Sequence, residues 1–129
     1  MKIKVTPLDK KIDARGWLIE NESSAIRDSM KHFLVSASKP GAIRGQHYHR
    51  KKKEWFIVVK GEAEVVFEDI NTKESARIVV NGEEPKVIET SPFVAHAFKN
   101  IGKDDMCLVA IVNEPLDKKD PDTLTYKVI

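Results

Sequence analysis

The sequence has one cysteine and no long hydrophobic run, and each shortage excludes a class of protein. A single cysteine excludes a disulfide within the chain, and its position inside the apolar segment Met106–Val112 predicts that Cys107 is a buried thiol. No apolar stretch approaches the roughly 18 residues of a membrane span. The opening Met-Lys-Ile-Lys-Val-Thr lacks the apolar core of a signal peptide. We therefore expect a cytoplasmic protein with no membrane partner.

The chain also lacks a strong excess of either charge. Its 22 Lys and Arg residues against 20 Asp and Glu residues give a net charge of +2. The resulting pI of about 8.6 is too mild to indicate binding to nucleic acid. A length of 129 residues, with 41% hydrophobic and 33% charged residues, is typical of one globular domain with a densely charged surface. We expect residues 1–129 to form that single domain.

Short segments rich in Val, Ile and Phe recur along the whole chain, with Gly, Pro, Asn or Asp between them. Strands at such regular spacing predict an all-β sandwich or barrel. Only Glu22–Lys31 has a helical pattern, and Lys2–Val5 is a candidate edge strand. The other expected strands are Phe33–Ser38, Ala42–His49, Trp55–Lys60, Ala63–Glu68, Ala76–Val80, Lys86–Glu89, His96–Asn100, Met106–Asn113 and Leu124–Val128.

Three of the four histidines follow a spacing that suits a metal site. His47 and His49 are two apart in an expected strand, so their side chains project to the same face. A turn through the basic loop brings Glu54 back beside them, and His96 opens a later strand. Imidazoles and a carboxylate are ligands for a divalent ion, with zinc expected first and nickel, iron or manganese as alternatives. The competing interpretation, which we retain for His32, is a histidine in a satisfied polar niche.

The same stretch resembles a known family. Gly41-x5-His47-x-His49-x4-Glu54-x6-Gly61 is similar to the complete first motif of the cupins. The resemblance implies one cupin domain over nearly the whole chain. A cupin is a small antiparallel β-barrel of the jelly-roll type, also called a double-stranded β-helix, with its site inside the barrel.

The second cupin motif is only partly present. Pro92, His96 and Asn100 match it, but Phe93 or Val94 stands where cupins usually carry glycine. This departure puts the local turn in question more than it does the ligand His96.

Segments from both ends of the chain narrow the resemblance. Asp13-Ala14-Arg15-Gly16-Trp17 and Arg44-Gly45-Gln46-His47-Tyr48 are similar to dTDP-4-dehydrorhamnose 3,5-epimerases and the related sugar-nucleotide ketoisomerases. The C-terminal cupin domain of bifunctional capsular polysaccharide enzymes is closer still, on the segments Val35–Gly41, Asn113-Glu114-Pro115 and Pro121-Asp122-Thr123. A reductase domain precedes the cupin in those enzymes, so we expect any reductase partner here to be a separate protein or absent. The resemblance implies epimerisation beside the ketone of a nucleotide-linked 4-keto-6-deoxysugar, with a metal in the cupin.

Epimerisation beside a ketone needs a base for the α-proton, a stabiliser for the enolate and an acid on the other face. In a metal design, His47, His49, Glu54 and His96 hold the ion, which acts as the Lewis acid. In the metal-free design of the rhamnose epimerases, the histidine of Arg-Gly-x-His is the base, oriented by a carboxylate, and the resemblance implies that His47 would take this role here. A glutamate beside two histidines suits a cation better than an enolate, which favours the metal design.

Arg44 is the candidate contact to substrate. It precedes the histidines by an odd number of residues, so on a regular strand its side chain points away from them. A bulge at Gly45 would reverse it, and the family resemblance then implies contact with the phosphate or sugar. A surface contact at the rim is the competing interpretation. Trp17, Trp55 and Phe98 are expected in the core or the barrel wall.

Two other functions stay open besides the epimerase or isomerase. The first is a metal-dependent cupin that acts on a different small molecule, as an oxygenase or another isomerase, because the motif alone does not determine the chemistry. The second is a cupin that binds a ligand without catalysis. The family resemblance further implies a homodimer, since pairing protects exposed edge strands.

Overall fold

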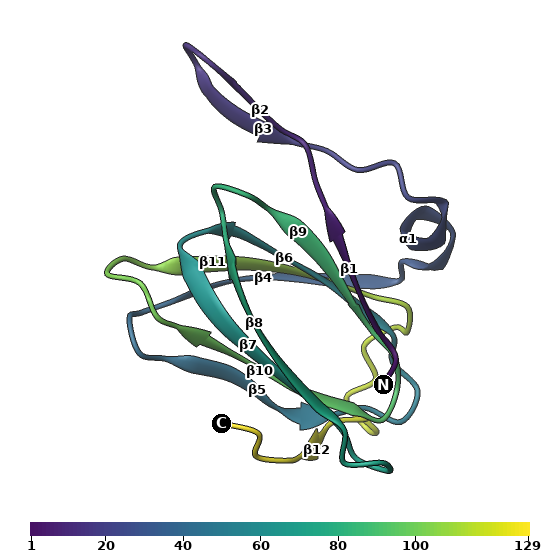
Figure 1. The fold of residues 1–129 in the computed structure, drawn as a ribbon. Helices are drawn as coiled ribbons and strands as arrows, with labels where there is room; N and C mark the ends of the chain where they lie inside the picture. The colour runs from purple at the N-terminus through teal and green to yellow at the C-terminus, as the bar shows by residue number, and fades with distance from the viewer.

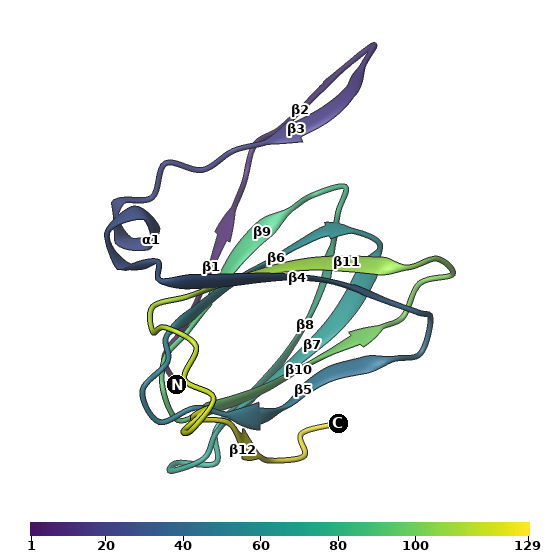
Figure 2. The ribbon, with the colours of Figure 1, turned by 180° about the vertical axis from the view of Figure 1, so that it is seen from behind.

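The computed structural model describes all 129 residues, and its regular secondary structure consists almost entirely of antiparallel strands (Figure 1). One five-stranded sheet has the order β1 (Ile3–Pro7), β9 (Lys86–Thr90), β6 (Glu54–Lys60), β11 (Met106–Val112), β4 (His32–Ser38). The second has the order β12 (Leu124–Thr125), β5 (Ile43–Tyr48), β10 (Val94–Asn100), β7 (Glu62–Asp69), β8 (Ser75–Asn81). The sheets face each other and enclose a common interior, as the view from behind also shows (Figure 2). The predicted all-β jelly roll is confirmed.

The core lies between the two sheets because the strands alternate apolar and more polar positions. In β11, Met106, Leu108 and Ala110 are buried, whereas Cys107 and Val109 between them are partly exposed, so the expectation that Cys107 is a buried thiol was wrong. This period of two directs every second side chain into the interior. The main cluster of buried apolar side chains comprises Phe56, Val58, Ala63, Val65, Phe67, Val80, Ile88, Val94, Phe98, Met106, Leu108 and Ala110.

Most expected strands are present with small shifts of their ends, but three N-terminal features differ. The expected helix shrinks to α1 (Ser24–Ser29), which Ser23 caps by accepting a hydrogen bond from the Ile26 amide. A hairpin of β2 (Lys10–Asp13) and β3 (Gly16–Ile19) projects away from the barrel (Figure 1). The expectation that Trp17 lies in the core was wrong, because it sits on this hairpin and is half-exposed.

The helix α1 is too short and too polar to cross a membrane. The candidate edge strand near the N-terminus is β1, which pairs only with β9 at the margin of its sheet. At the C-terminus, the expected strand Leu124–Val128 is reduced to the two residues of β12.

A β-bulge in β5 sets the direction of the side chains around the histidines. His47 pairs with His96, but Gly45 pairs with Ala97 and Arg44 with Phe98, so the register shifts by one residue at Gln46. Gly45 has φ of +95°, and a Cβ there would lie 2.5 Å from the carbonyl oxygen of His96. Glycine is therefore required where β5 passes β10.

Candidate metal centre

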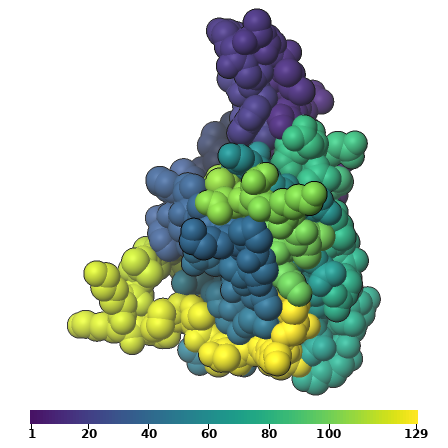
Figure 3. All heavy atoms as spheres, turned by 90° about the vertical axis from the view of Figure 1, so that its left-hand side faces the viewer, coloured from purple at the N-terminus to yellow at the C-terminus, as the bar shows by residue number.

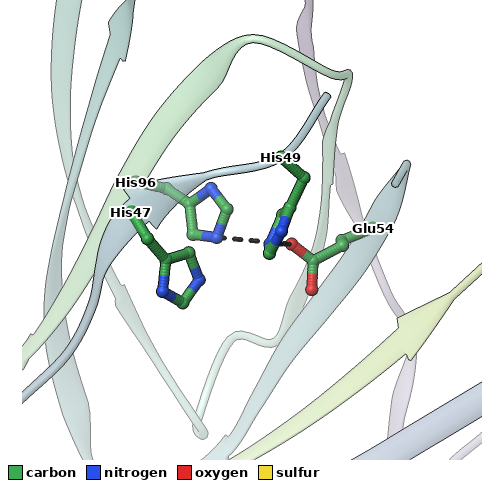
Figure 4. Close-up of side chains that lie close together, drawn as sticks. All are labelled: His47, His49, Glu54 and His96. Atoms are coloured by element: carbon green, nitrogen blue, oxygen red, sulfur yellow. Dashed lines mark ion pairs between the residues drawn. The ribbon is translucent and has the colours of Figure 1, made fainter. Parts of the chain in front are cut away.

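Three neighbouring segments bring the predicted ligands together at one end of the barrel interior (Figure 4). His47 lies on β5 and His49 directly follows it, Glu54 begins β6, and His96 lies on β10. Their ligand atoms all lie within 4.8 Å of one another. His49, Glu54 and His96 are 5%, 6% and 2% exposed, while His47 is only half-buried. The cluster therefore opens to solvent on the side of His47.

Glu54 contacts both buried histidines of the cluster. Its Oε1 is 2.7 Å from Nε2 of His49 and 3.4 Å from Nε2 of His96. The ring of His47 lies at centroid distances of 4.8 Å from His49 and 5.1 Å from His96. Despite the short contact, Nε2 of His49 and Oε1 of Glu54 are buried without a hydrogen bond of acceptable geometry. Two buried polar atoms without a partner are costly.

The hydrogen bonds of Nδ1 in His49 and His96 determine whether Nε2 of each ring carries a proton or a free lone pair. Nδ1 of His49 is 2.6 Å from the carbonyl oxygen of Asp122, and Nδ1 of His96 is 3.1 Å from that of Val94. A carbonyl oxygen can only accept, so each Nδ1 carries the proton and donates it. In the neutral rings, both Nε2 lone pairs therefore point toward the same carboxylate oxygen. Three acceptor atoms around one point require a positive charge, and a single proton can bridge only one pair of them.

Burial and mutual repulsion make two of the histidines resist protonation. Burial, followed by the proximity of His96 and His49, lowers the pKa of His47 to about 4. Burial also lowers the pKa of His96. For His49, burial acts downward, but the neighbouring Glu54 outweighs it and the pKa is raised. The pKa of Glu54 is lowered, because contact with His49 outweighs burial.

The donor set fits a divalent metal ion. Ligand atoms about 2.0–2.2 Å from a shared zinc ion lie within about 4 Å of one another, and the present cluster is close to that size. Neutral imidazole and ionised carboxylate are the protonation states that a metal requires. His47, His49, Glu54 and His96 are the residues that would hold it.

The side chain of Arg44 faces the interior of the barrel. On a regular strand, its odd separation from His47 would have directed it outward. The bulge at Gly45 places it opposite the inward Phe98, on the same face as His47. Its Nε donates to Oγ of Ser38 at 2.9 Å, and its terminal nitrogen donates to the carbonyl oxygen of Ala37 at 3.2 Å. The side chain remains exposed. A guanidinium group thus lies on the inner face of the barrel, on the strand that carries His47.

The weak second cupin motif is explained by an unusual residue. Phe93 adopts a φ of +66°, which is the left-handed conformation that glycine normally supplies. The turn before β10 therefore keeps its shape, and His96 points inward.

Sequence reasoning missed the part played by Asp122. It is 5% exposed, although it lies in a largely exposed segment far along the chain from His49. Its contact to His49 is made by the backbone carbonyl, which carries no residue-specific signal. Only the resemblance of Pro121-Asp122-Thr123 to the capsular enzymes drew attention to this position.

A jelly-roll barrel with three histidines and a glutamate inside it defines a cupin. More narrowly, the chain belongs to the family described as the polysaccharide biosynthesis C-terminal domain, whose model matches residues 11–124. The resemblance to the cupin domain of the capsular enzymes is thereby confirmed.

Two relatives share more than 30% identity with this chain. The UDP-2-acetamido-2,6-beta-L-arabino-hexul-4-ose reductase of Pseudomonas aeruginosa is 37% identical over 116 residues, which cover 90% of this chain and 30% of the relative. The crystal structure of the capsular polysaccharide assembling protein CapF of Staphylococcus aureus is 32% identical with a TM-score of 0.73, covering 95% of this chain and 33% of that one. The chain thus spans about a third of the length of either relative.

A more distant structure supports the fold alone. The dTDP-4-dehydrorhamnose 3,5-epimerase of Sulfolobus tokodaii is 21% identical with a TM-score of 0.78, covering 94% of this chain and 74% of that one. The two proteins therefore share the fold of the barrel.

Proposed function

We propose that this protein is a metal-binding isomerase or epimerase that acts beside the ketone of a nucleotide-linked 4-keto-6-deoxysugar during polysaccharide precursor synthesis. The observation that carries the proposal is the convergence of Nε2 of His49, Nε2 of His96 and Oε1 of Glu54. The first and the last of these atoms are buried without a hydrogen bond. His47 completes the set from the open side. Zinc is the first candidate ion, with nickel, iron and manganese as alternatives.

Two of the relatives support the substrate class. The names of the reductase and of the Sulfolobus tokodaii epimerase each specify a sugar that is joined to a nucleoside diphosphate and oxidised at carbon 4. Arg44 supplies the matching charge on the inner face of the barrel, because a guanidinium group binds phosphate oxygens in pairs. We therefore assign substrate binding to Arg44.

The chemistry requires removal of the proton next to the ketone and its return on the other face, with no net change in oxidation state. An ion held by the four residues would polarise the ketone and its enolate as a Lewis acid. The chain's own groups that would contact the sugar nucleotide are Arg44 and His47. His47 is the one member of the cluster that reaches the open side, so it is the group nearest to an incoming substrate.

The test is solvent-deuterium exchange into a UDP- or dTDP-linked 4-keto-6-deoxysugar, followed by mass spectrometry. We expect the zinc-loaded protein to introduce deuterium beside the ketone and the metal-stripped protein to lose this activity. His49→Ala should behave like the stripped protein. His32→Ala is the matched control, because it removes a histidine outside the cluster.

Three outcomes would redirect the proposal. Full exchange by metal-free protein, abolished by His47→Ala, would make His47 the catalytic base and the ion irrelevant. Binding of the sugar nucleotide without exchange would identify a binding cupin. Oxygen consumption by the iron-loaded protein would identify an oxygenase that acts on another small molecule.

We further propose that the protein is a homodimer. The edge strand β4 presents Phe33 and Val35 at 63% and 65% exposure, and the projecting hairpin presents Ile12 at 72% and Leu18 at 52%. Figure 3 shows this hairpin, in purple, standing clear of the rest of the molecule. A two-stranded hairpin is marginally stable alone in water.

Light scattering should show a dimer of the wild-type protein at micromolar concentration. Val35→Lys should weaken this dimer, because it places a charge on the exposed face of β4. A wild-type protein that is monomeric under these conditions would refute the proposed assembly.

A further inference from the structure

The C-terminal segment returns to the metal cluster after leaving β11. In the space-filling view its yellow residues pack beneath the blue segment that includes β5 (Figure 3). The strand β12 pairs Leu124 with Tyr48 and Thr125 with His47. Just before β12, Asp122 is buried, although the residues preceding it are exposed. A buried carboxylate in an exposed segment needs a specific set of partners.

The carboxylate of Asp122 binds the loop that joins the two central ligands. Its Oδ1 accepts from the amide of Arg50 at 2.9 Å. Its Oδ2 accepts from the amides of Lys51 at 2.8 Å and Lys52 at 3.2 Å. Three consecutive backbone N–H groups thus converge on one side chain. This loop begins directly after His49 and ends just before Glu54, so its shape sets how the two ligands face each other.

The backbone of the same residue binds His49 itself. The carbonyl oxygen of Asp122 accepts from Nδ1 of His49 at 2.6 Å. Asp122 adopts a φ of +50°, a left-handed conformation that aspartate tolerates better than most residues. In this conformation the residue contacts the ring through its carbonyl and the loop through its carboxylate.

We infer that Asp122 is a positioning residue of the metal site, which fixes the proton of His49 on Nδ1 and holds the loop from His49 to Glu54 in the shape that directs both ligands inward. The inference rests on the proposed function, because it treats His49 and Glu54 as ligands. Outer partners of this kind typically change metal affinity by about 10–100-fold when they are lost.

The test compares the zinc affinity of wild-type and Asp122→Asn apo-protein by competition with a chromophoric chelator. Asparagine keeps the size of the side chain and tolerates the left-handed backbone, but it turns an amide toward N–H donors. We expect the dissociation constant for zinc to rise by about tenfold or more. Asp122→Gly, which accepts the positive φ without strain, is the second variant should Asp122→Asn fail to fold.

Asp69→Asn is the matched control. The Asp69 carboxylate also holds a turn, by accepting from the amides of Asn71 at 2.9 Å and Thr72 at 3.1 Å, but it does not contact the cluster. We expect this variant to lose thermal stability while its zinc affinity stays at the wild-type value. Equal zinc affinity in wild-type and Asp122→Asn protein would overturn the inference.

A second readout does not need a metal. Nitrogen-15 NMR of the apo wild-type should show a proton on Nδ1 of His49, protected from exchange, and this protection should be lost in Asp122→Asn. A wild-type ring protonated at Nε2 alone would overturn the inference. If the wild-type protein binds no ion, the metal proposal fails, but the NMR comparison still decides whether Asp122 positions His49.

Discussion

The strands β6 and β10 each place a polar and an apolar residue on the same inward face, two positions apart. At the open end these are Glu54 and His96, and one step deeper they are Phe56 and Phe98. The two phenylalanine rings lie 4.9 Å apart and pack against the apolar core. At the polar end, buried acceptor atoms face one another without hydrogen bonds. Both pairs lie on the same two strands, and the side chains make one region an apolar core and the other a polar cluster that suits a cation.

Removal of a metal ligand should have the largest effect on the polar end of the barrel. His49→Ala should reduce zinc affinity by more than the roughly 10–100-fold that is typical for loss of an outer partner, because it removes a ligand itself. The variant should remain folded, since the apolar cluster does not include this residue. Metal analysis after dialysis, together with circular dichroism, measures both quantities. Stoichiometric zinc in this variant would show that the ion is held elsewhere.

A substitution in the apolar region should have the opposite effect: it should lower stability and leave zinc binding unchanged. Phe98 is 1% exposed, and Phe98→Ala should lower the free energy of unfolding by about 3–5 kcal/mol. Its zinc stoichiometry should remain that of the wild type, because the ligands are on other positions. Denaturant unfolding of the apo-protein and metal analysis of the folded fraction test the pair of expectations. A Phe98→Ala protein that keeps full stability would contradict the assignment of this region as the core.

Adding metal should stabilise the polar end. An ion that binds only the folded state contributes about 2.7 kcal/mol at a free concentration of 100 times its dissociation constant. Zinc should therefore raise the melting temperature of the wild type and of His32→Ala, but not that of His49→Ala. Scanning calorimetry of the three stripped proteins, with and without zinc, gives the answer. An equal shift in all three would indicate nonspecific binding.

The pH dependence of zinc affinity sharpens the account of the polar end. The pKa of His47, lowered to about 4, keeps this ring neutral between pH 5 and 6.5. Burial also lowers the pKa of His96, which favours its neutral form. The pKa of His49 is raised, so this ring must lose its extra proton to bind the ion. Zinc affinity should therefore fall about tenfold for each pH unit of decrease in this range, because binding of one ion releases one proton, that of His49.

Zinc titrations between pH 5 and 6.5 measure this slope. A slope of three protons per ion would mean that the three histidines titrate near their ordinary pKa. No dependence at all would mean that His49 is neutral throughout.

Much of this arrangement could be predicted from the sequence, because residues two apart on a strand point to the same face. The spacing of His47 and His49, with Glu54 after a short loop, determines that the three meet once strands and a turn form. The bulge at Gly45 could be named as an option, but only the pairing with β10 decides it. The hairpin β2–β3 was missed because it packs against no core and lacks the alternation of a half-buried strand. The contact of Asp122 with His49 was beyond prediction, since it joins distant segments through a backbone carbonyl.

The central claim is that the polar end of the barrel holds one divalent ion through three imidazoles and one carboxylate. X-ray absorption at the zinc edge of the reconstituted protein tests it most directly. The account predicts one zinc per chain, bound only by nitrogen and oxygen at about 2.0–2.2 Å, with the imidazole signal reduced in His49→Ala. A sulfur ligand at about 2.3 Å, or a spectrum of hydrated zinc without imidazole, would contradict it.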